Sequence, residues 1–321
     1  MSEKDIRRNA AISDKLKNYP EIITKYYQNL LESGKSLGTA RTYMASIFQF
    51  LDYSYGDHIP DDFFYSTSEN DITFFLDSLK AKGDPNVSAS GSAKAAVWSA
   101  LMSLFSFIST KYSQVNNPVE NIPRPAMTKK SASDLVYLTP EEASTLLDAV
   151  ERDSSLDFMY RDMSIVMLGL FSGLRINEIL DLNVDDVDIQ NGTVRINDLQ
   201  KGVRFINVSE SVQRTLRGWL SDRKYNFAYI DTDALFVSQV KRRLSADMVQ
   251  KFLNKYAKEL DKHITPRVLR NTFAVNLYKK TKDIMLLAKY LDHASIATTQ
   301  RYVDQLMLKE EKTFNMDCLY D

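Results

Sequence analysis

The sequence predicts a mainly α-helical protein with a small β-sheet insert, built as an N-terminal helical bundle followed by a second α-rich domain. Amphipathic helical periodicity runs from about Tyr19 to Tyr112 without a strand pattern. A proline-containing, polar stretch then breaks helix formation. Helical patterns resume beyond it, around one segment of alternating residues between Asp186 and Val208. A chain of 321 residues can bury a core in each of two domains.

The first domain, residues 1–124, is expected to be a small helical bundle. Gly34 follows the first amphipathic segment and is a suitable helix stop. The predicted helices are four amphipathic segments: Tyr19–Glu32, Ser36–Leu51, Asn70–Leu79 and Ser92–Ile108.

A linker is predicted over residues 125–136 and a second domain over 137–321. Asn117-Pro118, Pro123 and Pro125 disfavour helix, and the residues from Lys129 to Ser133 are polar. Thr139 to Glu142 then forms a capping box with proline at the first helical position, which predicts a helix start.

The β insert is predicted as a hairpin with a third strand. An Asn191-Gly192 turn joins the first two strands, and Lys201 lies at the tip of the next turn, expected over Asp198 to Val203. The predicted strands are Asp186–Ile189, Thr193–Ile196 and Arg204–Val208. Farther on, Thr265-Pro266 should begin one helix and Ser295 should cap another.

Composition favours an intracellular, cytoplasmic protein without a membrane span. The N-terminus lacks a signal-peptide pattern, and no apolar run approaches the roughly 18 residues that a span needs. The single cysteine, Cys318, excludes an internal disulfide and a cysteine-based zinc site. A net charge of −1 counts against a simple nucleic-acid binder, but it does not show whether basic residues cluster on one face.

Several side chains suggest an anion site, although each has an ordinary alternative role. Arg267 and Arg270 lie three apart at a helix start, hence on one face near the positive end of the helix dipole. Alone, such a pair is more often a solvated basic face. Arg175 follows a helix-stopping glycine, and Glu178 one turn later could orient it, as in many structural ion pairs.

Four motifs, which occur in a fixed order along the chain, favour a functional site over these ordinary roles. They are Gly-Leu-Arg-Ile-x-Glu-Ile from Gly173, Lys-Gly at Lys201, Thr-Pro-x-x-Leu-Arg-x-Thr-Phe-Ala from Thr265, and Leu-x-His-x-Ser-Ile-x-Thr-Thr-x-x-Tyr from Leu291. This combination resembles the tyrosine recombinase (phage integrase) family, especially its compact Xer-like members. The resemblance covers most of the chain. It implies that the first domain is a core-binding domain and the second the catalytic domain.

The resemblance implies a phosphate-binding role for three of these residues and a supporting role for a fourth. Arg175 and Arg270 would bind the non-bridging oxygens of a scissile phosphate, since both can offer bidentate hydrogen bonds. His293 would donate a further hydrogen bond, and Glu178 would support Arg175.

The resemblance also implies the chemistry. Tyr302 would be the nucleophile that forms a 3′-phosphotyrosyl bond, and Lys201 the general acid that protonates the leaving 5′ oxygen. Rejoining is the reverse reaction, so neither a metal nor another cofactor is required.

One position departs from the family. Where histidine usually precedes the second arginine by three residues, this chain has Arg267. Arginine cannot accept the tyrosine proton because its pKa stays above about 12. We expect Arg267 to stabilise the phenolate electrostatically, while water or a neighbour takes the proton.

The expected partner is double-stranded DNA, held by both domains as a clamp. Arg41, Lys94, Lys129 and Lys130 are the candidates for backbone contacts, and an ordinary solvated role is about as good for each. A C-terminal tail from about residue 305 is expected to dock on a neighbouring subunit and to join a tetramer on two DNA sites; docking on its own domain is the alternative.

The leading expectation is a site-specific recombinase that acts in recombination, integration and excision, or inversion. One alternative is a DNA-binding regulator of the same fold that is impaired at Arg267. A second is a type IB topoisomerase, which uses similar tyrosine chemistry.

Overall fold

The computed structural model describes residues 3–81, 83–126, 135–198, 202–226, 232–293 and 295–313, with side chains from residue 10 to residue 308 of these ranges. The chain divides into two compact units, Met1–Lys130 and Ser131–Asp321. Each unit has a hydrophobic core of its own.

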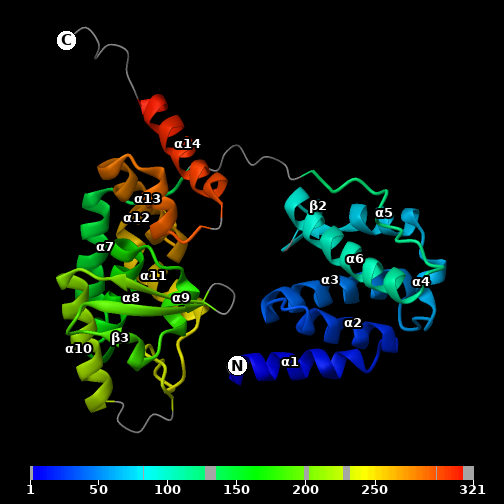
Figure 1. The fold of residues 1–321 in the computed structure, drawn as a ribbon, viewed down its shortest axis with the longest axis horizontal. Helices are drawn as coiled ribbons and strands as arrows, with labels where there is room; N and C mark the ends of the chain where they lie inside the picture. The colour runs from blue at the N-terminus through cyan, green and yellow to red at the C-terminus, as the bar shows by residue number, and fades with distance from the viewer. Residues whose placement is uncertain are drawn as a thin grey trace. The chain divides into compact units, whose positions relative to one another are not determined.

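Unit 1 is the helical bundle that the sequence predicts (Figure 1). The packing of α3 against α6 forms its centre, where the Phe50 and Phe105 rings meet edge to face with centroids 6.4 Å apart. Ser36 caps α3 by accepting a hydrogen bond from the Thr39 N–H. The helices are α1 (Glu3–Leu16), α2 (Glu21–Glu32), α3 (Leu37–Tyr55), α4 (Phe63–Ser66), α5 (Glu69–Ser78) and α6 (Gly91–Lys111).

Two features of unit 1 differ from the prediction. Helix α1 was not expected, because its sequence is mostly polar; from the part of α1 whose side chains are described, Ile12 and Leu16 reach the core. A two-stranded hairpin, β1 (Lys80–Ala81) with β2 (Asp84–Ser88), interrupts the helices where no strand was expected. Every residue of β2 is exposed, so the strand carries no alternating pattern that a sequence could reveal.

The expectation that no apolar segment approaches the length of a membrane span is wrong for helix α6. It is long and apolar enough to cross a membrane by length and composition alone. In this structure α6 supplies buried side chains such as Leu101, Leu104 and Ile108 to the core of unit 1. It is therefore a core helix of the bundle.

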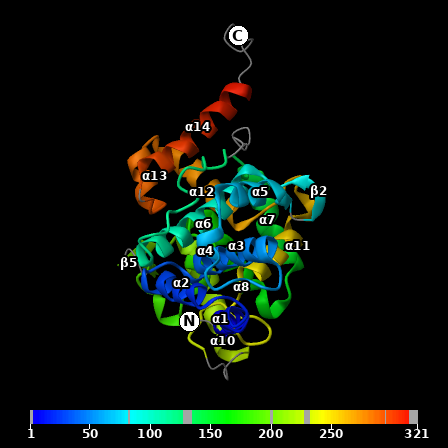
Figure 2. The same cartoon turned by 90° about the vertical axis from the view of Figure 1, so that its right-hand side faces the viewer.

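Unit 2 is built around α8, which packs against α7, α10 and α12 (Figure 1). Helices α12, α13 and α14 lie together in both views (Figure 1 and Figure 2). The α-helices are α7 (Pro140–Asp153), α8 (Met159–Ser172), α9 (Ile176–Asp181), α10 (Glu210–Asn226), α11 (Ala246–Tyr256), α12 (Pro266–Thr281), α13 (Ile284–Tyr290) and α14 (Ile296–Thr313). Short 3₁₀ helices occupy Leu156–Phe158, Val184–Asp186 and Ala257–Glu259.

The helix starts in unit 2 follow their sequence signals. Thr139 and Glu142 form the predicted capping box of α7, and Thr265 caps α12 by accepting from the Val268 N–H. The Ser295 hydroxyl accepts a hydrogen bond from the Ala297 N–H at 3.2 Å, as expected for the start of α14.

The β insert is an antiparallel sheet in the order β3-β4-β5. Its strands are β3 (Val187–Asp188), β4 (Thr193–Asp198) and β5 (Gly202–Asn207). The register pairs Asp198 with Gly202, so β4 ends and β5 begins two residues closer to Lys201 than the predicted Ile196 and Arg204. Residues 199–201, including Lys201, lie outside the described ranges.

Candidate active site

Two glycines in and after α8 bring the candidate arginines together. An added Cβ on Gly169 would lie 2.9 Å from the Leu269 Cβ, so α8 and α12 approach closely at this level. Gly173 ends α8 in the left-handed conformation, with φ at 64°, as its sequence context predicts. The chain then turns directly into Arg175, which faces the α12 residue Arg270.

Arg175 is held by side-chain and backbone acceptors at the start of α9. Its backbone N–H donates to Glu178 Oε2 at 2.7 Å, and its Nη1 donates to Glu178 Oε1 at 2.8 Å. Its Nη2 donates to the carbonyl oxygens of Leu291 at 3.2 Å and Asp292 at 3.0 Å. The orienting role predicted for Glu178 therefore has a geometric basis.

Arg270 is almost fully buried, with 7% of the residue exposed. Its Nη1 donates to the Gly173 carbonyl at 2.7 Å, and its Nη2 donates to the Leu291 carbonyl at 2.6 Å. Burial, together with the neighbouring charge of Arg175, lowers the pKa of Arg270 to about 10. The guanidinium is therefore still protonated at neutral pH.

Glu178 is a carboxylate shared between arginines. Its Oε2 lies 3.9 Å from Arg270 Nη1, in addition to its bonds with Arg175. Burial alone would raise the pKa of Glu178, but hydrogen bonds and charge from Arg175 and Arg204 outweigh it and hold the pKa below its ordinary value. Glu178 is thus an anion at neutral pH, and it holds the guanidinium groups of Arg175 and Arg204 by hydrogen bonds.

His293 and Tyr302 lie beside this arginine pair. His293 Nε2 is 3.4 Å from Arg270 Nη2, and its Nδ1 is 2.9 Å from Thr299 Oγ1. The His293 ring stacks on the Tyr302 ring with centroids 5.8 Å apart and an interplanar angle of 25°. The histidine after α13 and the tyrosine on α14 are thereby brought together.

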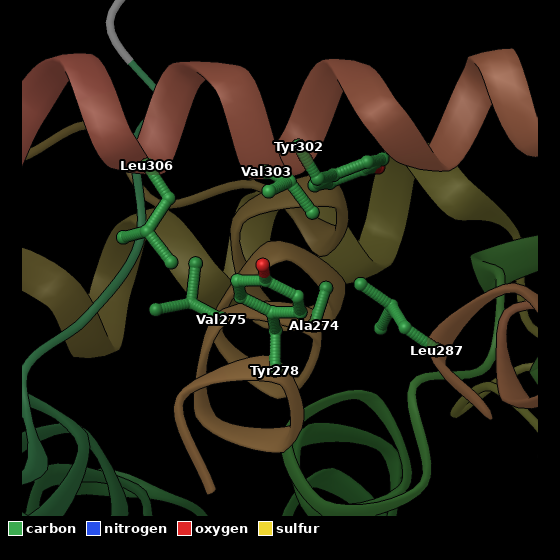
Figure 3. Close-up of a pocket in the computed structure, with 7 residues that line it drawn as sticks. All are labelled: Ala274, Val275, Tyr278, Leu287, Tyr302, Val303 and Leu306. Carbon is green, nitrogen blue, oxygen red and sulfur yellow. The ribbon is translucent and has the colours of Figure 1, made fainter. Parts of the chain in front are cut away.

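Tyr302 is half-buried at the edge of an apolar pocket. Figure 3 shows Tyr302, Val303 and Leu306 coming from α14 toward Tyr278 and its neighbours on α12. The remaining lining residues are Ala274, Val275 and Leu287. This packing fixes the backbone that carries Tyr302 while the phenol ring stays partly accessible.

The other predicted site residues have different surroundings. Arg267 is exposed, and it makes no hydrogen bond or ion pair with any residue that the structure describes. Lys94 is paired with Asp77 at 3.1 Å and is only 18% exposed, whereas Arg41 is half-buried on α3. Lys129 and Lys130 lie outside the described residues, as does Lys201.

Two residues that the sequence did not single out complete the site. Arg204 on β5 donates from Nη2 to Glu178 Oε1 at 2.9 Å. The Asp292 carboxylate lies 3.6 Å from both Arg204 Nη1 and Arg175 Nη1. Their only sequence signal was their position beside predicted site residues. Arg204 lies on the predicted strand just after Lys201, and Asp292 directly precedes His293.

The beginning of unit 2 is attached to α12 next to Arg270. Asn271 Nδ2 donates to the Val136 carbonyl at 3.0 Å, and the Leu138 N–H donates to Thr272 Oγ1 at 2.9 Å. Leu135, which the predicted linker includes, is buried against unit 2.

The arrangement can bind an oxyanion and present a phenol beside it. Three guanidinium groups converge on two carboxylates, which leaves a net positive charge among these five groups. Among the described residues, no group of three or more histidine, cysteine, aspartate or glutamate side chains is placed to hold a metal ion. Phosphate and carboxylate are the anions whose geometry such planar arginine donors match.

Comparison with known proteins identifies the family. A sequence model of the phage integrase family matches residues 136–309. The tyrosine recombinase XerC of Alcanivorax borkumensis is 32% identical over 206 residues, which are 64% of this chain and 66% of that protein. The tyrosine recombinase XerA of Pyrococcus furiosus is 26% identical over 283 residues, 88% of each chain.

The fold agrees with this relationship. The structure is similar to that of the XerH site-specific recombinase bound to palindromic difH substrate in a post-cleavage complex, with a TM-score of 0.67 and 23% identity. The match covers 88% of this chain and 81% of XerH. Nothing in these relationships favours a regulator or a topoisomerase. With a family match over more than half of its length, the chain belongs to the phage integrase family and is a Xer-like tyrosine recombinase.

Proposed function

We propose that this protein is a site-specific DNA recombinase that cleaves and rejoins double-stranded DNA through a 3′-phosphotyrosyl intermediate formed on Tyr302. The observation that carries the proposal is the convergence of Arg175, Arg270 and His293, with Tyr302 stacked on His293. A permanently charged phosphate-binding group and a phenol are the two parts that such a reaction needs.

In the proposed reaction, Tyr302 Oη attacks the scissile phosphorus and the bond from phosphorus to the 5′ oxygen breaks. Arg175 and Arg270 bind the non-bridging oxygens and stabilise the charge that develops on them. Lys201 gives a proton to the leaving 5′ oxygen, and His293 donates a hydrogen bond to the phosphate. Attack by a 5′-hydroxyl on the phosphotyrosine reverses each step and restores the tyrosine, so the bond energy is conserved.

We assign Arg267 an electrostatic role. Arg267 is exposed on the first turn of α12, one turn before the buried Arg270. In the DNA complex its charge would stabilise the Tyr302 phenolate, and the phenol proton would pass to water.

We assign DNA binding to both units, with unit 1 as the core-binding domain and unit 2 as the catalytic domain. The proposed assembly is a tetramer on two DNA sites in the cytoplasm, joined by the C-terminal tail. Met307 and Leu308 on α14 are half exposed, and these apolar side chains support docking on a neighbouring subunit.

Covalent trapping tests the proposal. The protein would be incubated with nicked duplexes tiled from the DNA that flanks its own gene and then denatured in detergent. A DNA-linked band is expected for the wild type and for Tyr278→Phe, a control tyrosine from the same pocket (Figure 3). Tyr302→Phe should yield no band. DNA binding without any adduct in the wild type would contradict the enzymatic function.

A further inference from the structure

Asp292 places a negative charge inside the group of arginines. Its carboxylate lies 3.6 Å from a guanidinium nitrogen of Arg175 and 3.6 Å from one of Arg204. Separations of this size are longer than hydrogen bonds, and the Asp292 side chain is 24% exposed. These two contacts of Asp292 are longer than those of Glu178, whose Oε1 lies within 2.9 Å of nitrogens of both Arg175 and Arg204.

The backbone at Asp292 is also unusual. Its φ is +48°, in the left-handed region that non-glycine residues seldom adopt. Its carbonyl accepts a hydrogen bond from Arg175, so one residue contacts this arginine through both backbone and side chain. A residue that keeps a sparsely populated conformation at a site merits a functional explanation.

The formal charges of the site residues indicate what Asp292 and Arg204 do together. Arg175 and Arg270 carry two positive charges, and Glu178 and Asp292 carry two negative charges. Without Arg204 the formal charges of these four groups would sum to zero. Arg204 supplies the third positive charge, and Asp292 offsets part of it.

We propose that Asp292 is an internal counter-anion, held between Arg175 and Arg204, whose place the scissile phosphate takes when DNA binds. Arg204 is then a further positioning residue that restores the positive charge of the site. This inference rests on the proposed function, because that function identifies the incoming anion as a DNA phosphate. The Asp292 carboxylate is partly exposed and lies farther from Arg175 and Arg204 than the Glu178 carboxylate does, so it is the one of the two that phosphate displaces.

Inorganic phosphate is the probe for this inference, since it requires no knowledge of the target duplex. The chain has three histidines, His58, His263 and His293, so ring signals of histidine-labelled protein can be assigned by substitution. His293 Nε2 lies 3.4 Å from Arg270 Nη2, so its ring signals should shift as phosphate enters the site.

The expected result is a set of compensating changes in the phosphate dissociation constant. Asp292→Asn, which keeps the side-chain shape, should tighten binding about fivefold, as expected for removing one partly exposed charge. Arg204→Ala should weaken binding by a similar factor, and the double variant should return close to the wild type. Asp292→Gly, which suits the positive φ, should behave like Asp292→Asn.

Asp304→Asn is the matched control. It removes one charge from α14, where the carboxylate accepts a hydrogen bond from Gln300. This variant should bind phosphate within about twofold of the wild type.

Weaker phosphate binding by Asp292→Asn, or an effect no larger than that of Asp304→Asn, would overturn the inference. The same conclusion follows if the double variant is as weak as Arg204→Ala, or if phosphate shifts His293 in none of the proteins. Adduct formation by the wild type, lost in Tyr302→Phe, is scored separately. A positive adduct with a negative phosphate result would therefore reject only the role of Asp292 and Arg204.

Discussion

Arg175 and Arg270 share one acceptor: the Leu291 carbonyl receives a hydrogen bond from Nη2 of Arg175 at 3.2 Å and from Nη2 of Arg270 at 2.6 Å. These residues lie on separate helices, and the shared carbonyl comes from the turn that precedes His293. The turn thereby couples the positions of both arginines to that of the histidine. Substituting any one of these three residues should therefore change the positions of the other two.

Arg270→Lys should reduce covalent adduct formation by about 10²- to 10³-fold, the range for losing one preorganised donor group. A lysine ammonium cannot reproduce the planar pair of bonds to the Gly173 and Leu291 carbonyls. Initial rates of adduct formation on a nicked duplex measure the effect. Arg195→Lys, on β4 in an ion pair with Asp186 of the 3₁₀ helix before β3, is the control and should keep its rate. Equal rates for both variants would contradict the phosphate-binding role.

Gly173→Ala should lower the free energy of unfolding by about 2–4 kcal/mol, through left-handed strain and overpacking combined. The new Cβ would lie 2.3 Å from Phe273 Cδ1. Urea denaturation measures the change. Gly202→Ala separates the two causes, since its φ is +87° but no atom lies within 4 Å of the added Cβ. It should cost only the strain, about 1–2 kcal/mol.

Arg267→Ala should slow adduct formation about tenfold, because one positive charge near the phenolate is lost. Arg267→His should match or exceed the wild-type rate, since histidine can also accept the phenol proton. Arg301→Ala removes an exposed arginine beside Tyr302 and controls for general DNA attraction. Loss of cleavage in Arg267→His with full activity in Arg267→Ala would show that the electrostatic role is wrong.

Glu178→Gln should destabilise the protein at pH 7 by about 1–3 kcal/mol, because the partly buried donors of Arg175 and Arg204 lose a charged partner. The folded-state pKa of Glu178 is depressed, so its contribution is present above the unfolded value of about 4.3. That contribution is lost as the pH falls through the lower folded-state pKa. Unfolding curves at pH 7 and pH 3 should therefore differ less for Glu178→Gln than for the wild type. A variant with unchanged acid sensitivity would show that Glu178 does not contribute in this way.

Deletion of the residues after Lys309 should reduce cooperative binding to a two-armed duplex by about tenfold or more, while single-site binding stays within about twofold. The reason is that the proposed tail contact acts only between subunits. Mobility-shift titrations on one-site and two-site duplexes separate the two effects. Unchanged cooperativity would favour a tail that docks on its own unit.

Local sequence signals predicted the helix ends that depend on interactions between residues close together in the sequence. The capping box at Thr139, the stop at Gly173 and the start at Thr265 each depend on hydrogen bonds or dihedral angles within a few residues. Helix α1 and the β1–β2 hairpin escaped prediction because their residues are mostly polar or exposed. Helix α1 has few apolar residues, and β2 is exposed along its whole length, so it carries no alternating pattern.

The sequence by itself determined the fold class, the family and the order of the motifs that contain Arg175, Arg270, His293 and Tyr302. Only the tertiary structure decided which side chains meet. Residues three apart on a helix differ by about 60° in direction, so Arg270 is buried in the site while Arg267 is exposed. Arg204 and Asp292 belong to the site because Arg204 on β5 contacts both Glu178 on α9 and Asp292 in the turn before α14. Such contacts depend on how distant segments pack, and no local spacing encodes them.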